Sequence, residues 1–166
     1  MYLKDLDKNK YTLIESDNLN YQYMGRVDFE NPKAPTIIYA GSMIKTRFTG
    51  RSVKVAVKNV HAYYENAIGF IIDGNITGKA VIEEHNKDII LDIAEGLSEE
   101  VHDLILFKRS DAAHYFDFYG IILEKGCHLE APEAKSNRRI ECFGDSVSAG
   151  EVSEAVEYVG KSDPEG

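Results

Sequence analysis

The sequence predicts an antiparallel β-sandwich followed by the first strand and loop of an α/β domain that is cut short. Roughly nine short strand-like segments fill the region from about residue 20 to residue 125, with Gly, Asn, Asp and Pro between them. No long segment with helical periodicity occurs before residue 130. Short strands at this spacing are typical of a sandwich, and we expect a jelly roll.

The first half of the predicted sandwich contains five strands. Val53, Val55 and Val57 alternate with lysines, which predicts that the three valines face the interior. Gly50-Arg51 forms a tight turn just before them. The five expected strands are Tyr21–Val27, Thr36–Ala40, Ile44–Thr49, Val53–Lys58 and Ala67–Ile72.

The second half begins with the hairpin-turn residues Asp73-Gly74-Asn75. Asn75-Ile76-Thr77 also matches a glycosylation sequence, but without a visible secretory signal we interpret it as part of this turn. The expected strands that follow are Lys79–Ile82, Ile89–Ile93, Val101–Lys108 and Phe116–Leu123.

Three regions follow from this pattern. Residues 1–130 form the sandwich, and the polar, proline-containing residues 131–138 form a linker. Residues 139–166 begin an incomplete second domain, whose first strand is Arg139–Phe143. The tail is compatible with either a short helix or a long surface loop, because Val152, Ala155, Val156 and Val159 are spaced as on one helix face.

Composition excludes several classes of protein. The 166 residues carry a net charge of −9, which argues against nucleic-acid binding and gives no attraction to anionic membranes. No segment is apolar enough to span a bilayer, and no secretory signal is visible, so we expect a cytoplasmic protein. The two cysteines, Cys127 and Cys142, then fit a reducing compartment. A homo-oligomer is compatible with the sequence.

The residues that point to catalysis are Phe143-Gly144-Asp145-Ser146. An apolar strand that ends in a glycine turn can present a hydroxyl at its carboxyl end, as nucleophile sites do. Gly-Asp-Ser alone is a weak signal, because many turns contain it. The Gly-x-Ser-x-Gly spacing is also absent, since Ser148 stands where the last glycine would be.

Residues 138–150 resemble the first conserved block of the SGNH (GDSL) hydrolases. The preceding sandwich is similar to the N-terminal domain of carbohydrate esterase family 2, whose members are acetyl xylan esterase-like deacetylases with a sandwich joined to an SGNH domain. The segments that carry this second resemblance are Gly25-Arg26, Ala40-Gly41-Ser42, Thr46–Gly50, His102-Asp103-Leu104, Phe107–Ser110 and Gly120-Ile121.

The resemblance implies a serine esterase that removes acetyl groups from xylan or related sugars through an acyl-enzyme on Ser146. The backbone N–H of Ser146 would be one oxyanion donor, and Asp145 would shape the turn. The catalytic His and the other oxyanion donors belong to later blocks that this chain lacks. The 166 residues alone are therefore expected to be inactive, and the partners are an acetylated carbohydrate and the rest of the SGNH domain. No metal or organic cofactor is implied.

Other side chains suggest chemistry less strongly. The five histidines show no metal-ligand spacing, and we do not expect any of them to serve Ser146, although His114 is the least unfavourable candidate. Tyr63-Tyr64 and Tyr115-Phe116 could stack on sugars, but a core or strand-edge role is the preferred interpretation. The five histidines are His61, His85, His102, His114 and His128.

A second function is consistent with the same residues. The chain could be a non-catalytic jelly-roll module that binds carbohydrate or mediates assembly, with Gly144-Asp145-Ser146 as a linker turn. The amino acids encoded after Gly166 distinguish the two hypotheses. An α/β pattern with an Asn-containing block and a late His favours the esterase, whereas a stop codon favours the module.

Overall fold

The structure is a computed structural model that describes residues 6–62, 65–141 and 143–145. The chain divides into two units, Met1–Ala134 and Lys135–Gly166, and every strand among the described residues lies in the first. The described residues form no helix, so none of them belongs to a helix that could cross a membrane.

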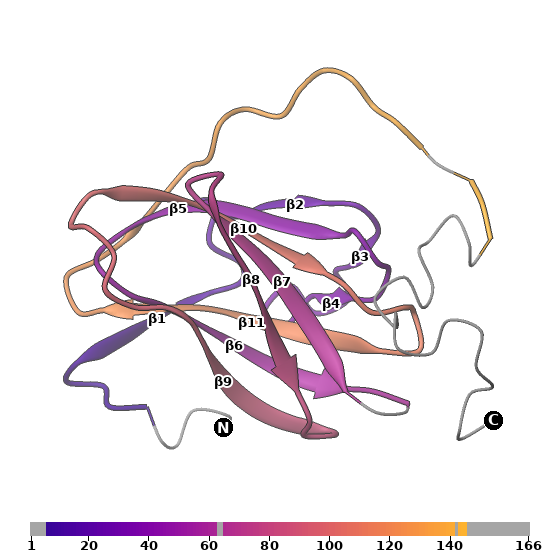
Figure 1. Ribbon diagram of the computed structural model, residues 1–166, viewed down its shortest axis with the longest axis horizontal. Helices are drawn as coiled ribbons and strands as arrows, with labels where there is room; N and C mark the ends of the chain where they lie inside the picture. Colours follow the sequence, from indigo (N-terminus) through magenta and orange to yellow (C-terminus); the bar gives the residue numbers. More distant parts are fainter. Residues whose placement is uncertain (1–5, 63–64, 142, 146–166) are drawn as a thin grey trace. The chain divides into compact units, whose positions relative to one another are not determined.

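Two six-stranded antiparallel sheets build the first unit (Figure 1). Sheet A contains β1 (Tyr11–Glu15), β3 (Val27–Asp28), β4 (Thr36–Ile37), β6 (Val53–Val60), β9 (Lys87–Ala94) and β11 (Tyr115–Glu124). Sheet B contains β2 (Gln22–Met24), β5 (Met43–Thr49), β7 (Asn66–Ile72), β8 (Ile76–Ile82), β10 (Val101–Lys108) and β12 (Leu129–Glu130).

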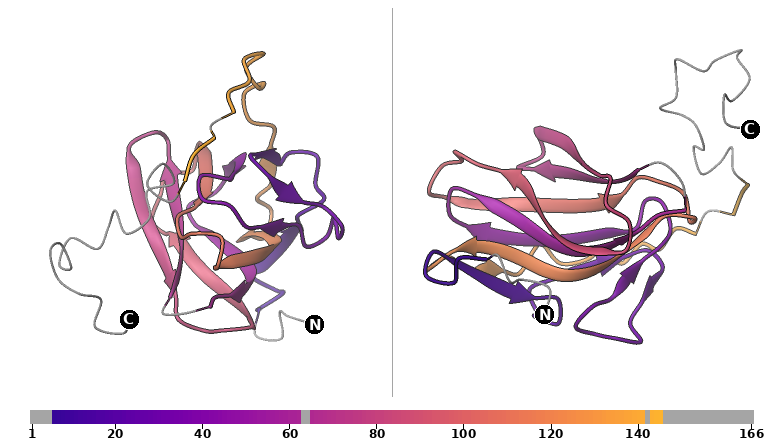
Figure 2. Two further views of the ribbon diagram at one scale, coloured as in Figure 1. Left: turned by 90° about the vertical axis from the view of Figure 1, so that its right-hand side faces the viewer. Right: turned by 90° about the horizontal axis from the view of Figure 1, so that it is seen from below.

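The strand order confirms the jelly roll. Sheet A contains the order β4-β11-β6-β9, and sheet B contains the order β5-β10-β7-β8. From β4 to β11 the chain changes sheet at every step except the β7–β8 hairpin, so each sheet receives strands that are distant in sequence. This alternation wraps the two sheets face to face around one core, as the side views in Figure 2 show.

The core lies between the sheets and is built from the inward positions of the long strands. Val53, Val55 and Val57 are fully buried there, as their alternation with polar residues predicts. Phe48, Phe116 and Phe118 fill the space between the layers with the aliphatic residues of β7, β10 and β11.

Two glycines in sheet B make room for aromatic rings. Phe107 lies directly opposite Gly69 in the β10–β7 pairing, and its ring covers the glycine on the outer face. Phe70 lies opposite Gly78 in the β7–β8 pairing and covers that glycine on the inner face, where its ring packs against the core. A Cβ at either glycine would collide with the opposite ring, so each phenylalanine ring occupies the space that a side chain at the glycine would need.

Strand β1, like the short β12, was not among the strands expected from the sequence. Its pairing with the end of β11 places Tyr11 and Leu13 over the outer face of sheet A, against Ala56, Tyr119 and Ile122. The segment Tyr11–Glu15 alternates only loosely, and its burial is divided between the two faces: Ile14 packs against the main core, and Tyr11 and Leu13 pack against this second, smaller cluster on the outside of the sheet. The segment therefore lacks the regular alternation of apolar and polar residues that indicates a strand with one buried face.

The expected strand Tyr21–Val27 is also divided in two. Gly25 adopts a positive φ of 90°, which turns the chain from β2 in sheet B to β3 in sheet A. A Cβ there would lie 2.8 Å from the Oγ of Ser42, so this turn needs both the conformation and the small size of glycine.

Candidate functional site

The predicted nucleophile Ser146 lies outside the described residues, and the structure does not test its role. Arg139–Glu141 and Phe143–Asp145 are described and form irregular chain, so the described residues of the segment expected as a strand over Arg139–Phe143 form no strand. Ile140 and Phe143 are 85% and 90% exposed, and no described strand pairs with this segment. An isolated strand is unstable without neighbours that satisfy its backbone and cover its apolar side chains.

The described polar clusters lie at the two ends of strand β7. Asn66 begins the strand inside one buried network, and Asp73 directly follows its last residue at the other end. A strand rises about 3.4 Å per residue, so the two clusters are on the order of 20 Å apart. They are therefore separate sites.

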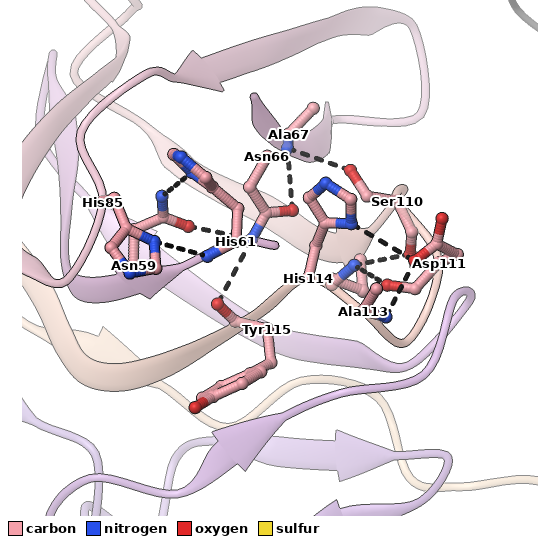
Figure 3. A network of polar contacts seen from close by, with 11 residues as sticks. Asn59, His61, Asn66, Ala67, His85, Ser110, Asp111, Ala113, His114 and Tyr115 are labelled. Atoms are coloured by element: carbon pink, nitrogen blue, oxygen red, sulfur yellow. Dashed lines mark hydrogen bonds and ion pairs between the residues drawn. The ribbon is translucent and has the colours of Figure 1, made fainter. Parts of the chain in front are cut away.

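Two buried asparagines form the centre of the first cluster (Figure 3). Asn66 Nδ2 donates to Asn59 Oδ1 at 2.9 Å and to the carbonyl oxygen of Tyr115 at 3.3 Å. Asn59 Nδ2 in turn donates to the carbonyl oxygen of Glu84 at 2.7 Å. These side chains join β6, β7, β11 and the β8–β9 turn, and their hydrogen bonds compensate for burial inside a sandwich.

Lys108 supports the β10–β11 connection beside these asparagines. Its side chain is 1% exposed, and its ammonium group donates to the carbonyl oxygens of Ser110 and Asp111. Burial lowers the pKa of Lys108 to about 8, against an opposing effect of the Asp111 charge. Because both its bonds go to loop carbonyls, we interpret Lys108 as a residue that shapes the loop.

Three histidines surround this network, one from each of three connections. The rings of His61 and His85 are 5.0 Å apart between centroids, and those of His61 and His114 are 6.3 Å apart. His114 is buried, and its Nδ1 lies 3.2 Å from a carboxylate oxygen of Asp111. No group of three or more His, Cys, Asp or Glu side chains in the described residues could hold a metal ion.

The aromatic residues singled out as sugar platforms divide into two cases. Phe116 is 2% exposed and belongs to the core, so it cannot stack on a sugar. Tyr115 is half-buried beside the asparagine network. Tyr63 and Tyr64 lie outside the described residues.

The second cluster joins His102, Asp73 and Ser98. His102 is 4% exposed, and its Nδ1 lies 2.7 Å from Oδ2 of Asp73. Its Nε2 lies 3.2 Å from the carbonyl oxygen of Ser98 and 3.4 Å from the hydroxyl of the same residue. The sequence pattern did not identify His102 as a site residue, although it occupies the same inward phase as Leu104 and Leu106.

Ser98, His102 and Asp73 are the residue types of a nucleophilic triad, but their hydrogen bonds indicate a structural role. The carbonyl oxygen of Ser98 is only an acceptor, so the Nε2 of His102 carries a proton and cannot serve as the base for the hydroxyl. Burial opposes the charged form, but the bonds to Asp73 and Ser98 outweigh it and raise the pKa of His102. The pair connects the β7–β8 turn to β10.

We expect the Asp73–His102 pair to stabilise the fold most strongly at mildly acidic pH. Burial raises the pKa of Asp73, but the bonds from His102 and the Asp103 N–H outweigh it, so the net shift is downward. Its contribution is therefore lost as the pH falls below the ordinary value of 3.8. The pKa of His102 is raised, so its contribution is full below 6.5 and is lost as the pH rises through the raised value.

Asp73→Asn keeps the shape of the side chain and removes its charge. The measurement is the free energy of unfolding of both proteins in urea, from about pH 4 to about pH 9. Near pH 5.5, Asp73→Asn should lower the free energy of unfolding by roughly 1–2 kcal/mol, because the pair is partly exposed. The loss should become smaller as the pH rises. A difference between the two proteins that does not change with pH would contradict the ion pair.

Residues 23–132, well over half of the chain, match the family model described as carbohydrate esterase 2 N-terminal. A curated relative, the cellulase/esterase CelE of Acetivibrio thermocellus, is 32% identical over 135 residues, which cover 81% of this chain and 16% of the relative.

Solved structures of family two carbohydrate esterases have the same fold. One from Clostridium thermocellum in complex with cellohexaose is 30% identical with a TM-score of 0.68, and the match covers 76% of this chain and 38% of that one. One from Cellvibrio japonicus has a TM-score of 0.72 at 22% identity over 86% of this chain and 41% of that one. The chain therefore spans less than half the length of each relative, and it belongs to the carbohydrate esterase 2 N-terminal family.

Proposed function

We propose that this chain is the N-terminal part of a serine carbohydrate esterase that removes O-acetyl groups from xylan or related sugars. One observation supports the proposal above all. The family match ends at residue 132, and Gly144-Asp145-Ser146 follows soon after it. A sandwich of this family followed by such a segment has the order expected of a two-domain esterase.

In the proposed reaction, the Oγ of Ser146 attacks the acetyl carbonyl carbon. The bond to the sugar oxygen breaks, the sugar leaves as an alcohol with a proton, and the acetyl group stays on the serine. Water then attacks the acetyl-enzyme and releases acetate. The backbone N–H of Ser146 stabilises the negative oxygen, and each such donor contributes roughly 3–4 kcal/mol to lowering the barrier.

The described sandwich supports the view that the general base comes from later residues. His102 is held by Asp73 and Ser98, and His114 lies beside Asp111. The Nδ1 atoms of His61 and His85 already accept hydrogen bonds from within the sandwich. Each of these four histidines therefore has a local structural role.

The substrate class is proposed from the relatives. A family two esterase from Clostridium thermocellum was solved with cellohexaose, a β-linked glucose oligomer. Xylan has a similar β-linked pyranose backbone, so an acetylated polysaccharide of this kind is the substrate that we propose for the intact protein.

The proposal predicts that activity needs both Ser146 and the residues encoded after Gly166. An aryl acetate should be hydrolysed by the chain extended with its natural continuation, whereas the 166-residue chain should give no turnover above background. In the extended protein Ser146→Ala should reduce kcat/KM by about a thousandfold or more with little change in stability. The matched control Ser148→Ala should retain most of the activity.

Three results would contradict the assignment. Turnover by the 166 residues alone, abolished by Ser146→Ala, would show that a histidine of this chain completes the site. Labelling of Ser148 by a serine-directed phosphonate would show that Ser148, and not Ser146, is the nucleophile. A continuation without an α/β pattern and a late His would favour the non-catalytic binding module.

A further inference from the structure

The β7–β8 hairpin turns on Asp73 and Gly74, which form the only Asp-Gly pair in the sequence. Both residues have a positive φ, 52° for Asp73 and 72° for Gly74, as in the two-residue hairpin turns that favour this dipeptide. The backbone N–H of Asn75 closes the turn on the carbonyl oxygen of Ile72 at 3.2 Å. Aspartate tolerates the left-handed conformation better than most residues, and glycine adopts it freely. The backbone geometry of the hairpin therefore accounts for this dipeptide.

The same dipeptide is chemically labile. The side-chain carboxyl group of an aspartate can react with the backbone nitrogen of the next residue, and a glycine has no side chain to obstruct this attack. A Cβ built on Gly74 would have no atom within 4 Å, so the surrounding chain leaves the turn open as well. Both Asp73 and Gly74 are exposed, which gives water access to the turn. The turn therefore has the composition and the solvent access that conversion of aspartate to isoaspartate requires.

Two hydrogen bonds hold the carboxylate of Asp73 in place. Its Oδ2 lies 2.7 Å from Nδ1 of His102, and its Oδ1 accepts the backbone N–H of Asp103 at 2.9 Å. The Nε2 of His102 lies 3.2 Å from the carbonyl oxygen of Ser98, so both ring nitrogens face acceptors and the protonated ring is favoured. Burial raises the pKa of Asp73, but the bonds from His102 and the Asp103 N–H outweigh it and keep the carboxylate ionised.

We propose that Asp73 is a site of isoaspartate formation and that the hydrogen bond from His102 restrains the reaction. The reactive form is the protonated carboxyl group, because its hydroxyl can leave as water whereas the oxygen of a carboxylate cannot. His102 binds Oδ2 of Asp73 and competes there with the proton that the reaction needs. The buried histidine therefore has a protective role that is independent of the esterase reaction.

The proposed reaction has two stages. First, the backbone nitrogen of Gly74 forms a bond to Cγ of Asp73, and the bond from Cγ to the hydroxyl breaks, so that the hydroxyl leaves with the amide hydrogen as water. The cyclic succinimide then takes up one water molecule. Breaking the bond between the nitrogen and Cγ restores aspartate, whereas breaking its bond to the main-chain carbonyl carbon leaves Gly74 attached through Cγ as isoaspartate. The sum is an isomerisation that needs no oxidant, reductant or cofactor.

The backbone N–H of Asp103 limits the effect of losing His102. It belongs to β10 and still holds Oδ1 of Asp73 when the imidazole is absent. Only Oδ2 is then released to bind a proton, so the reaction in the folded chain should remain slower than in the unfolded chain. Loss of one partly exposed, charge-assisted bond should accelerate the reaction about tenfold, the effect of about one unit in the pKa of the carboxyl group.

The main test compares the unmodified 166-residue chain with His102→Leu during incubation at about pH 5.5, where the raised pKa of His102 keeps the unmodified ring charged. Enzymatic methylation of the isoaspartyl carboxylate measures the amount of product, and mass spectrometry of the peptide that contains residue 73 locates it. Folded His102→Leu should accumulate isoaspartate at residue 73 about tenfold faster than the unmodified chain. Equal rates in the two folded proteins would overturn the proposal.

Two further variants separate the hydrogen bond from a general loosening of the turn. The matched control Ser98→Ala removes a hydroxyl 3.4 Å from Nε2 of His102 but keeps the carbonyl oxygen, so its rate should equal that of the unmodified chain. His102→Asn places an amide nitrogen near the position of Nδ1, and this nitrogen can donate to the carboxylate, so part of the protection should return. In concentrated urea, where the fold is lost, all four proteins should react at one rate. A folded His102→Asn that reacts as fast as the chain in urea would contradict the proposal, even if His102→Leu does not fold.

Discussion

Val55→Asp is expected to abolish cooperative unfolding of the chain at room temperature, because the protein will no longer fold. Val55 is 0% exposed at the centre of β6, between β9 and β11, and faces the core. The substitution loses roughly 1.5–3 kcal/mol of apolar burial. It also buries a carboxylate without a partner, which costs several kcal/mol more. A domain of this size is stable by only about 5–15 kcal/mol.

Val81→Asp is the matched control for that experiment. Val81 also lies within a strand, β8, but it is 38% exposed, so the new carboxylate stays in water. We expect a change of about 1 kcal/mol or less in its free energy of unfolding. Urea denaturation followed by circular dichroism compares the two variants. A normal transition for Val55→Asp would show that Val55 does not face the core between the two sheets.

Gly120→Ala is expected to cost about 3 kcal/mol or more in the free energy of unfolding. Gly120 has a φ of +143° at a bulge in β11, where the pairing with β6 shifts register. A Cβ at this position would lie 2.1 Å from the carbonyl oxygen of Ile14, which is backbone of β1 and cannot rotate away. The strained backbone and the displacement of β1 each contribute roughly 1–3 kcal/mol.

Gly74→Ala separates the effect of the backbone angle from that of the collision. Gly74 also has a positive φ, 72°, but a Cβ added to it at the β7–β8 turn would have no atom within 4 Å. Its replacement should cost only about 1 kcal/mol, the strain of the left-handed conformation. If Gly120→Ala were no more costly than Gly74→Ala, the close approach of β1 would not matter for stability.

Gly120 also gives a physical reason for one of the motifs that the chain shares with the esterase family. Gly120-Ile121 is one of the segments that carry the resemblance to the esterase family. The structure supplies its physical reason, because the backbone of β1 pairs with β11 at this point and occupies the place where a side chain would lie.

The buried polar side chains show which features of the interior depend on strand alternation and which depend on tertiary contacts. Asn59 continues the inward phase of Val53, Val55 and Val57, and His102 shares the inward phase of Leu104. The alternation is compatible with the buried positions of both polar side chains, but the structure and not the sequence analysis placed them inside the sandwich. Their partners come from other strands and connections, so the pairing itself could not be read from either segment alone.

By itself, the sequence determined the sandwich, its long strands and the inward valines, because alternation of apolar and polar residues is a local property of each strand. It also determined the family, through motifs distributed along the chain. Only the tertiary structure decided which histidines meet carboxylates and which meet N–H donors. It also decided where β1 packs and that residues 139–141 form no strand, because each of these depends on atoms brought together from segments distant in sequence.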